Sequence, residues 1–314
     1  MKVSICIPVY NVENLIGRCL DSVINQSYNN LEIIIVNDCT PDNSMQIVNQ
    51  YAQKDHRIKI INHDKNHGLM MTRKTGYMAA TGDYITFCDS DDYLPKDSIE
   101  ILYNEAIKTD ADVVSGDYMY ITVNGCQIIN HNKLNYGNDK LSVYKSLLRR
   151  ELNHTVWGKL YRSSVLKNYK YNTYENFTNG EDGCLFYQLV ENVNRVIQIN
   201  KPVYYYMQNT QSSTQVRLGD KAIKSICIVN KTKVDMISDY PDLKPDLQKC
   251  ITNVLYSLYS QGYGYSTRLD DYIVENGLEG YKKLSFKYLD ATELFKFWIK
   301  RYIQGPIWYI KALK

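Results

Sequence analysis

The chain lacks several features that would place it in common classes of protein. Its eight cysteines, at positions 6, 19, 39, 88, 126, 184, 227 and 250, form no C-x-x-C pair and have no histidines clustered beside them. This distribution argues against a zinc site and a disulfide framework, and it favours a reducing cytoplasm. No run of about 18 uncharged apolar residues occurs, so we predict no membrane-spanning helix.

Low net charge and missing glycine motifs exclude further classes. A net charge of +3 is too small to indicate binding to nucleic acid. No G-x-G-x-x-G or G-x-x-x-x-G-K-[ST] motif follows an apolar strand-like run, which argues against a dinucleotide site and a P-loop. With 314 residues, the chain is long enough for two modest domains, or for one domain with an appended piece.

Strand-like and helix-like patterns alternate along the first 115 residues. Short apolar runs at 3–9 and 31–36 predict strands buried on both faces, and apolar residues at helical spacing lie between them. This alternation predicts an α/β doubly wound, mostly parallel sheet, which binds ligands beyond the carboxyl ends of its strands. The other predicted helices are 41–54, 69–80 and 95–108, and the other predicted strands are 58–61, 83–88 and 112–115.

The pattern changes after residue 118. Residues 118–123 and 126–130 flank Asn124-Gly125 and predict an antiparallel hairpin. Later segments predict helices at 139–150 and 181–193, short strands at 194–199 and 203–207, and a helical, basic region from about residue 220.

Three carboxylates, Asp89, Asp91 and Asp92, follow the predicted strand 83–88 within four residues. Carboxylates this close repel one another unless positive charge lies among them. One Asp would most simply cap the next helix. Three favour a divalent cation that is bound by these carboxylates and by phosphate oxygens together. Neither an EF-hand nor an aspartyl-phosphatase motif fits, because the required Gly and Glu are missing and Tyr93 replaces Thr. A cation bound together with a nucleoside diphosphate fits best.

Other strand ends converge on the same edge of the sheet. The first strand ends in Pro8-Val9-Tyr10-Asn11, and the second ends beside Asp38. The Asp38 carboxylate can accept a hydrogen bond from the ring N–H of uracil or guanine, which adenine lacks. The segment 66–76 supplies Gly68 for a close turn, a helix start, and the cations Arg73 and Lys74 for phosphate.

The ordered segments VSICIPVYN, LEIIIVNDCTPDNS and NHGLMMTRKTGYMAATGDYITFCDSDDYL together resemble the nucleotide-sugar domain of family-two glycosyltransferases, which have the GT-A fold. The resemblance covers residues 1–120 and extends more loosely to about 210. It implies that Asp89 faces ribose and metal and that Asp91 is the metal ligand for Mn²⁺ or Mg²⁺. The implied nucleotide-sugar site consists of Pro8, Val9, Tyr10, Asn11, Glu13, Asp38, Gly68, Arg73, Asp89 and Ser90. Two departures from the family pattern, Thr72-Arg73-Lys74 for A-R-N and Asn37-Asp38 for D-D, concern the choice of sugar nucleotide.

The second half supplies a candidate base in the acids Glu181 and Asp182. From the residues alone, complementation of the helix dipole explains them as well as catalysis does. The resemblance implies that Asp182 is the general base, and that Trp157, Lys159 and Glu181 lie on the acceptor side. The face of Trp157 suits a sugar ring, although a core tryptophan is an equal explanation.

The sequence therefore predicts an inverting, metal-dependent transfer of a hexose from a UDP-sugar to a saccharide hydroxyl, on a cell-surface polysaccharide or a lipid-linked glycan precursor. The predicted divisions are 1–117 for the nucleotide sugar, 118–218 for the acceptor, and 219–314 for a helical basic region. The alternatives are a sugar-phosphate nucleotidyltransferase, which would carry a Gly-rich, Arg-containing loop at the first strand, and a non-catalytic carbohydrate-binding protein. The latter would be expected to lose one of Asp38, Asp89, Asp91 and Asp182.

The C-terminal segment 281–314 is strongly basic. Its eight basic and two acidic residues give it a net charge of +6 and leave −3 for residues 1–280. Tryptophan, phenylalanine and isoleucine alternate with these charges, a composition typical of peripheral anchoring to an anionic membrane surface. The alternative is a helix docked on the enzyme with its basic face in water.

Overall fold

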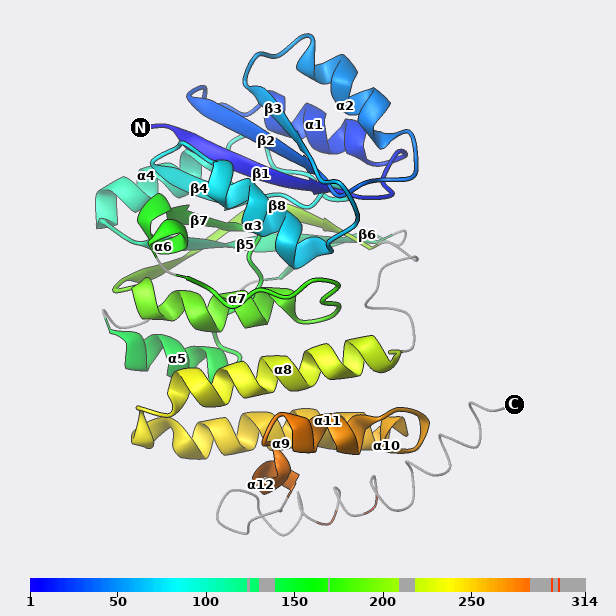
Figure 1. Cartoon of the computed structure of the whole chain (residues 1–314). Coiled ribbons are helices and arrows are strands. Elements are labelled where there is room, and N and C mark those ends of the chain that lie inside the picture. Colours follow the sequence, from blue (N-terminus) through cyan, green and yellow to red (C-terminus); the bar gives the residue numbers. More distant parts are fainter. Residues whose placement is uncertain are drawn as a thin grey trace.

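The computed structural model describes residues 1–122, 125–129, 139–168, 170–208 and 218–282, together with 295 and 299. Its central feature is an eight-stranded sheet with the order β3-β2-β1-β4-β7-β5-β6, in which β8 also pairs with β5 (Figure 1). The strands are β1 (Val3–Val9), β2 (Leu31–Asn37), β3 (Ile58–Asn62), β4 (Tyr84–Phe87), β5 (Val113–Thr122), β6 (Gly125–Ile129), β7 (Lys159–Arg162) and β8 (Val196–Met207).

The first four strands are all parallel, as the alternating pattern predicts. The strand next to β4 was not predicted: β7 lies between β4 and β5 and is antiparallel to both. The sequence pattern does not reveal β7, since this strand has only four residues and carries Lys159 and Arg162 at its ends. The α/β, mostly parallel fold is confirmed.

Two long strands replace pairs of shorter predicted ones. The predicted strands 112–115 and 118–123 form the single strand β5, which pairs with β6 in the expected antiparallel hairpin. The predicted strands 194–199 and 203–207 form β8, which crosses Pro202 through register shifts opposite Gly116 and Asp117. The boundary proposed after residue 117 therefore falls inside β5, and one sheet contains strands from both sides of it.

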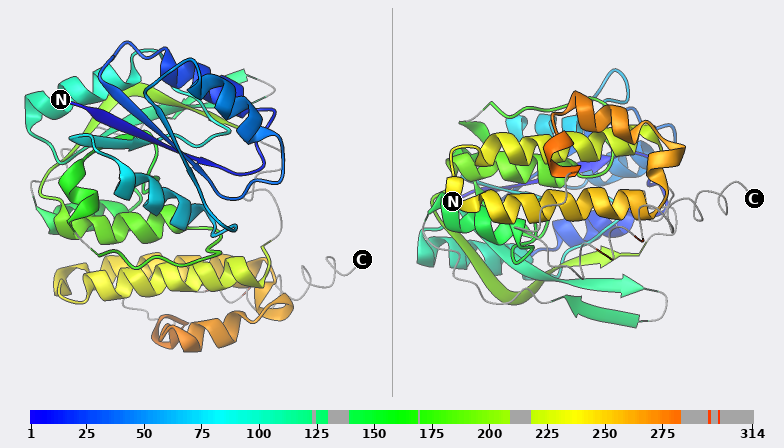
Figure 2. Two further views of the ribbon diagram at one scale, coloured as in Figure 1. Left: turned by 45° about the horizontal axis from the view of Figure 1, so that its top comes forward. Right: turned by 90° about the horizontal axis from the view of Figure 1, so that it is seen from below.

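Helices cover both faces of the sheet. Alternate residues of β1 and β2 enter two cores, with Ile5 and Ile7 packed in the core of α1 and α4, and Cys6 in the core that includes α3 and α7. Below α7, α8 and α9 lie side by side as a further layer (Figures 1 and 2). The helices are α1 (Ile16–Ile24), α2 (Ser44–Ala52), α3 (Leu69–Ala79), α4 (Ser98–Thr109), α5 (Lys140–Leu148), α6 (Ser163–Lys167), α7 (Glu181–Leu189), α8 (Asp220–Ile237), α9 (Lys244–Ser260), α10 (Tyr263–Ser266), α11 (Leu269–Glu275) and α12 (Glu279–Lys282), with short 3₁₀ turns at Val190–Asn192 and Pro241–Leu243.

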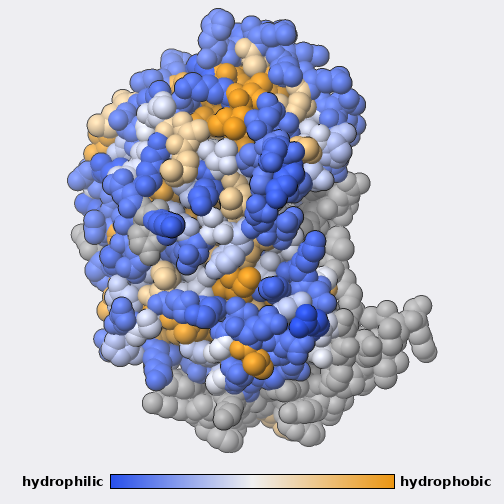
Figure 3. All heavy atoms as spheres, in the orientation of Figure 1, coloured by the Kyte–Doolittle hydropathy of each residue, from blue (hydrophilic) through white to orange (hydrophobic). Residues whose placement is uncertain are grey.

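Three expectations from composition can be compared with the structure. All eight cysteines lie in the described ranges and are free, as predicted, although Cys39 and Cys126 are exposed rather than buried. No helix in the described ranges is long and apolar enough to cross a bilayer. In the view of Figure 3, polar residues dominate the described surface and apolar groups form separate patches. The predicted basic anchor, residues 281–314, lies outside the described residues apart from 281, 282, 295 and 299.

Candidate active site

The largest concentration of predicted site residues surrounds one open cavity of about 520 Å³. The cavity lies where β1, β2 and β4 end, and the start of α7 also lines it. Its lining brings together most of the predicted residues with others that were not foreseen. The lining residues are Pro8, Val9, Tyr10, Val12, Asp38, Asn66, Gly68, Leu69, Thr72, Arg73, Asp89, Ser90, Asp91, His154, Thr155, Trp157, Asn179, Gly180, Glu181, Asp182 and Tyr206.

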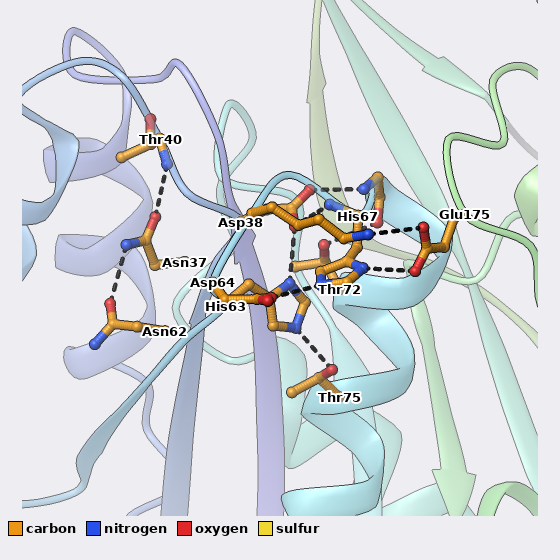
Figure 4. A network of polar contacts seen from close by, with 12 residues as sticks. Asn37, Asp38, Thr40, Asn62, His63, Asp64, His67, Thr72, Thr75 and Glu175 are labelled. Atoms are coloured by element: carbon orange, nitrogen blue, oxygen red, sulfur yellow. Dashed lines mark hydrogen bonds and ion pairs between the residues drawn. The ribbon is translucent and has the colours of Figure 1, made fainter.

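Asp38, at the end of β2, organises the loop before α3 (Figure 4). One carboxylate oxygen accepts from the backbone N–H of His67 at 2.9 Å and lies 2.8 Å from His63 Nδ1, and the other accepts from the N–H of Gly68 at 2.8 Å. Asp38 is only 3% exposed, so these bonds replace lost water. A carboxylate offers about four acceptor positions, and a base N–H would take the remaining one.

The same loop holds the chain segment that leads into α7. His67 Nδ1 lies 2.9 Å from the Glu175 carboxylate, and His67 O accepts from the N–H of Asn176 at 2.9 Å. Gly68 has φ +89°, and a Cβ there would lie 3.2 Å from the nitrogen of Asn176, so glycine is needed for this close approach. His63 and His67 therefore both belong to the network around Asp38.

Arginine side chains contact the acidic turn, residues 89–92, which follows β4. The Arg73 guanidinium donates to both oxygens of Asp89, at 2.7 and 3.0 Å, and is only 3% exposed. Arg18 donates to the backbone oxygen of Asp91 at 2.8 Å. Burial, and then the negative charge of Asp89, raises the pKa of Asp91 to about 6. Positive charge is thus concentrated at Asp89, while the Asp91 carboxyl remains poorly compensated.

A divalent cation fits this pair of carboxylates. Asp89 and Asp91 both line the cavity, and the raised pKa of Asp91 indicates that further positive charge would stabilise its ionised form. No group of three or more His, Cys, Asp or Glu side chains arranged for a metal occurs in the described ranges. Two protein carboxylates suit Mg²⁺ or Mn²⁺, which keep other ligand positions for phosphate oxygens and water.

Arg73 also binds the acids at the start of α7. Asp182 accepts from the guanidinium at 2.5 Å, and Glu181 lies 3.6 Å from the same nitrogen. The second oxygen of Asp182 accepts from the N–H of Val156 at 3.3 Å, and no side chain caps the helix start at Gly180. Burial, and then the charge of Asp182, raises the pKa of Glu181 to about 7. Asp182 therefore faces the cavity, and its side chain does not cap the helix.

Aromatic rings also contribute to the cavity lining. Trp157 is 8% exposed and stacks on Tyr204 and Tyr206, with centroids 4.5 and 5.3 Å apart. Its indole is therefore part of the core and also of the cavity lining. His154 also lines the cavity, and burial lowers its pKa to about 4, so the ring is neutral. His154 was not predicted from the sequence, and its position three residues before Trp157 is the feature that could have indicated it.

Three predicted site residues do not line the cavity. Glu13 accepts from the backbone N–H of Asn43 at 2.9 Å, and the Asn11 N–H donates to Thr40 at 2.8 Å, so both hold neighbouring loops together. Lys159 is 1% exposed and donates to the backbone oxygen of Thr155 at 2.7 Å. Burial lowers the pKa of Lys159 to about 7. Lys159 thus supports the segment that carries Thr155 and does not itself line the cavity.

The chain is similar in sequence to known proteins. The family model described as Glycosyl transferase family 2 matches residues 4–170. Glycosyltransferase GlyA of Streptococcus pneumoniae serotype 4 is 33% identical over 224 residues, which is 68% of this chain and 32% of GlyA. The chain thus spans about a third of the length of that relative.

Two solved structures resemble the fold. Residues 1–349 of S. aureus TarS in complex with UDP align with 98% of this chain and 89% of that one, with a TM-score of 0.69 and 19% identity. The mannosyltransferase PcManGT from Pyrobaculum calidifontis, in complex with GDP-Man and Mn²⁺, aligns with 97% of this chain and 87% of that one, with a TM-score of 0.53 and 14% identity. These two likenesses concern the fold alone.

Proposed function

Because the chain belongs to glycosyl transferase family 2, we propose that it transfers a hexose from a UDP-sugar to a saccharide hydroxyl with inversion at the anomeric carbon. The observation that carries the proposal is that one cavity is lined by Asp38, Asp89 and Asp91, which follow the ends of β2 and β4, and by Asp182 at the start of α7. The glycosyltransferase prediction is confirmed at the level of the family. The donor, the acceptor and the stereochemistry are the proposed part.

The donor side is built for a nucleotide and a diphosphate. Tyr10 is 47% exposed at the cavity edge and offers its ring to a base, and the free acceptor position of Asp38 suits the ring N–H of uracil. The solved structure of TarS contains UDP, which supports the choice of uridine. Asp89 and Asp91 would hold Mg²⁺ or Mn²⁺, which when bound supplies Lewis-acid stabilisation of the leaving diphosphate.

Asp182 is the proposed general base. Its carboxylate is anchored by Arg73 on one oxygen and by the Val156 N–H on the other, so its orientation is fixed before an acceptor arrives. Inversion requires that the base act on the face opposite the leaving group. Asp182 lines the same cavity as Asp89 and Asp91, but it comes from α7 and not from the turn after β4. A positioned base of this kind accelerates transfer by about 10²–10⁴-fold. Trp157, Glu181 and Tyr206 would border the acceptor.

A panel of nucleotides tests the donor assignment. UDP, GDP, CDP and ADP would each be titrated into the full chain by calorimetry, with Mn²⁺ and again with a chelator. We expect the tightest binding for UDP with Mn²⁺, and loss of most affinity on chelation. Equal binding of CDP and UDP would refute the role of Asp38, and binding unaffected by chelation would refute the metal.

We also propose that transfer takes place in the cytoplasm, at the inner membrane surface. The free cysteines and the basic composition of residues 281–314 support this location. The full chain should then bind anionic vesicles in a salt-sensitive manner, and truncation after residue 290 should abolish that binding while UDP still binds. A full chain that ignores anionic vesicles at low salt, or a truncated chain that unfolds, would show that the segment belongs to the globule.

A further inference from the structure

The last part of β8, the run Tyr204-Tyr205-Tyr206-Met207, lies directly against the acidic turn. The Tyr204 hydroxyl accepts from the backbone N–H of Asp89 at 3.0 Å and donates to the Asp92 carboxylate at 2.8 Å. Tyr204 is fully buried, and 115 residues separate it from Asp89. A single hydroxyl thus joins the first and the last acid of the turn.

Further contacts fix the same turn on β8. The second oxygen of Asp92 accepts from the N–H of Met207 at 2.8 Å. Tyr93 forms an isolated bridge with Tyr205, and their rings stack with centroids 4.5 Å apart. Asp92 is 1% exposed and does not line the cavity, unlike Asp89 and Asp91. The third acid of the sequence cluster is therefore a structural anchor.

We propose that Tyr204 is a positioning residue, which acts through its hydroxyl and Asp92 to hold Asp89 and Asp91 in the geometry that binds a divalent cation with a diphosphate. This inference rests on the proposed function, because it needs the cation to bind at these two carboxylates. The backbone of Asp89 sets the direction of its side chain. A hydrogen bond on its N–H, together with the anchored carboxylate three residues later, fixes the whole turn.

The ring and the hydroxyl of Tyr204 have separate roles, which makes the inference testable. The ring stacks on Trp157 at 4.5 Å with an interplanar angle of 17°, and phenylalanine would keep that contact. Tyr204→Phe therefore removes only the link to the acidic turn. Tyr144 offers a matched control, because it is fully buried and its hydroxyl also contacts one carboxylate, of Glu191, and one backbone group, of Tyr187. Tyr144 does not line the cavity.

The experiment compares Tyr204→Phe and Tyr144→Phe with the unchanged full chain. Mn²⁺ binding in the presence of UDP is measured by electron paramagnetic resonance, UDP binding in a chelator by calorimetry, and stability by thermal unfolding. We expect similar small losses of thermal stability in both variants. Mn²⁺ affinity should fall about tenfold in Tyr204→Phe only, because Mn²⁺ must then order the turn that the hydroxyl otherwise holds in place, and the lost buried hydrogen bond corresponds to about a factor of ten. UDP affinity in the chelator should stay unchanged.

Any other outcome contradicts either the positioning role of Tyr204 or the proposed metal site. If the unchanged chain binds Mn²⁺ and UDP and Tyr204→Phe binds Mn²⁺ equally well, the positioning role is wrong while the proposed function stands. If the unchanged chain binds no Mn²⁺, the proposed metal site itself is wrong. Should Tyr204→Phe fail to fold, Asp92→Asn takes its place with the same measurements, and unchanged Mn²⁺ affinity in that variant overturns the inference.

Discussion

The two walls of the cavity are built in different ways. The wall proposed to bind the donor, called the donor wall, includes Pro8, Tyr10, Asp38, Asp89 and Asp91. It consists of residues at the ends of the adjacent parallel strands β1, β2 and β4. The wall proposed to bind the acceptor, called the acceptor wall, includes His154, Trp157, Glu181, Asp182 and Tyr206. It is assembled from the irregular segment 154–157, the first turn of α7 and the end of β8. Regular backbone pairing positions the first wall, and side-chain contacts across long sequence distances position the second.

Arg73 is the physical connection between the walls. Its guanidinium binds Asp89 of the donor wall and Asp182 of the acceptor wall, so the two carboxylates lie on either side of one buried cation. Substitution of Arg73 would therefore remove positive charge from both walls at once. The comparison predicts that substitutions on each wall affect different steps, whereas substitution of Arg73 affects both.

The largest effect on transfer is expected from Asp182→Asn. The variant keeps the shape of the side chain but removes the proposed base, so the transfer rate should fall by about 10²–10⁴-fold. UDP binding with Mn²⁺, measured by calorimetry, should remain within a few fold of the unchanged chain, because the donor wall is intact. Near-normal turnover would show that Asp182 is not the base, and lost UDP binding would show that the walls do not act separately.

Arg73→Gln should have the largest effect on stability. It leaves the carboxylates of Asp89, Glu181 and Asp182 without their shared cation in a buried site, which typically lowers the free energy of unfolding by about 3–5 kcal/mol. Chemical denaturation measures this loss. Lys74→Gln is the neighbouring control, since Lys74 donates to Thr173 and not to an acid, and it should cost less than about 1 kcal/mol. Equal losses in both variants would contradict the role of Arg73.

Glu181→Gln should change how stability depends on pH. The pKa of Glu181 is raised to about 7 in the folded protein, so the native state binds more protons than the unfolded chain between the ordinary glutamate pKa and about 7. Stability therefore falls as pH rises through this window. Removing the group should stabilise the protein at pH 8 by on the order of 1–3 kcal/mol, since one pKa unit corresponds to about 1.4 kcal/mol.

Unfolding measured at pH 5 and pH 8 checks this expectation. The difference in stability between Glu181→Gln and the unchanged chain should be small at pH 5 and favour the variant at pH 8. A constant difference at both pH values would mean that Glu181 does not titrate in this window.

His67→Ala should have the smallest effect. Its ring bonds Asp64 and Glu175 near the surface, and these two carboxylates raise its pKa, Asp64 more than Glu175. Asp38 keeps its backbone donors when the ring is removed, so UDP affinity should fall by about threefold at most, because exposed ion pairs contribute little. The loss should shrink as salt is added. A tenfold or larger loss would indicate that segment 171–180 helps to form the donor wall.

The donor wall was predictable because its positions follow from local patterns. Apolar runs at 3–9, 31–36 and 83–88 predicted parallel strands, and the carboxyl ends of such strands meet at one edge of a sheet. Residues that directly follow those runs, such as Asp38 and Asp89, therefore had to converge. The resemblance of the same segments to a known family added the roles of these residues but not their contacts.

Contacts between distant segments decided the rest. Several contacts join residues that local periodicity treats independently. They are the pairing of four-residue β7 between β4 and β5, the Arg73–Asp182 pair, the His67–Glu175 contact, and the Tyr204 hydroxyl between Asp89 and Asp92. Their formation depends on how the second half of the chain packs against the first. The sequence by itself thus determined the parallel sheet and the location of the donor wall. Only the tertiary structure determined that one of three clustered acids anchors the turn and that one buried arginine joins both walls, because each arises from burial and long-range hydrogen bonding.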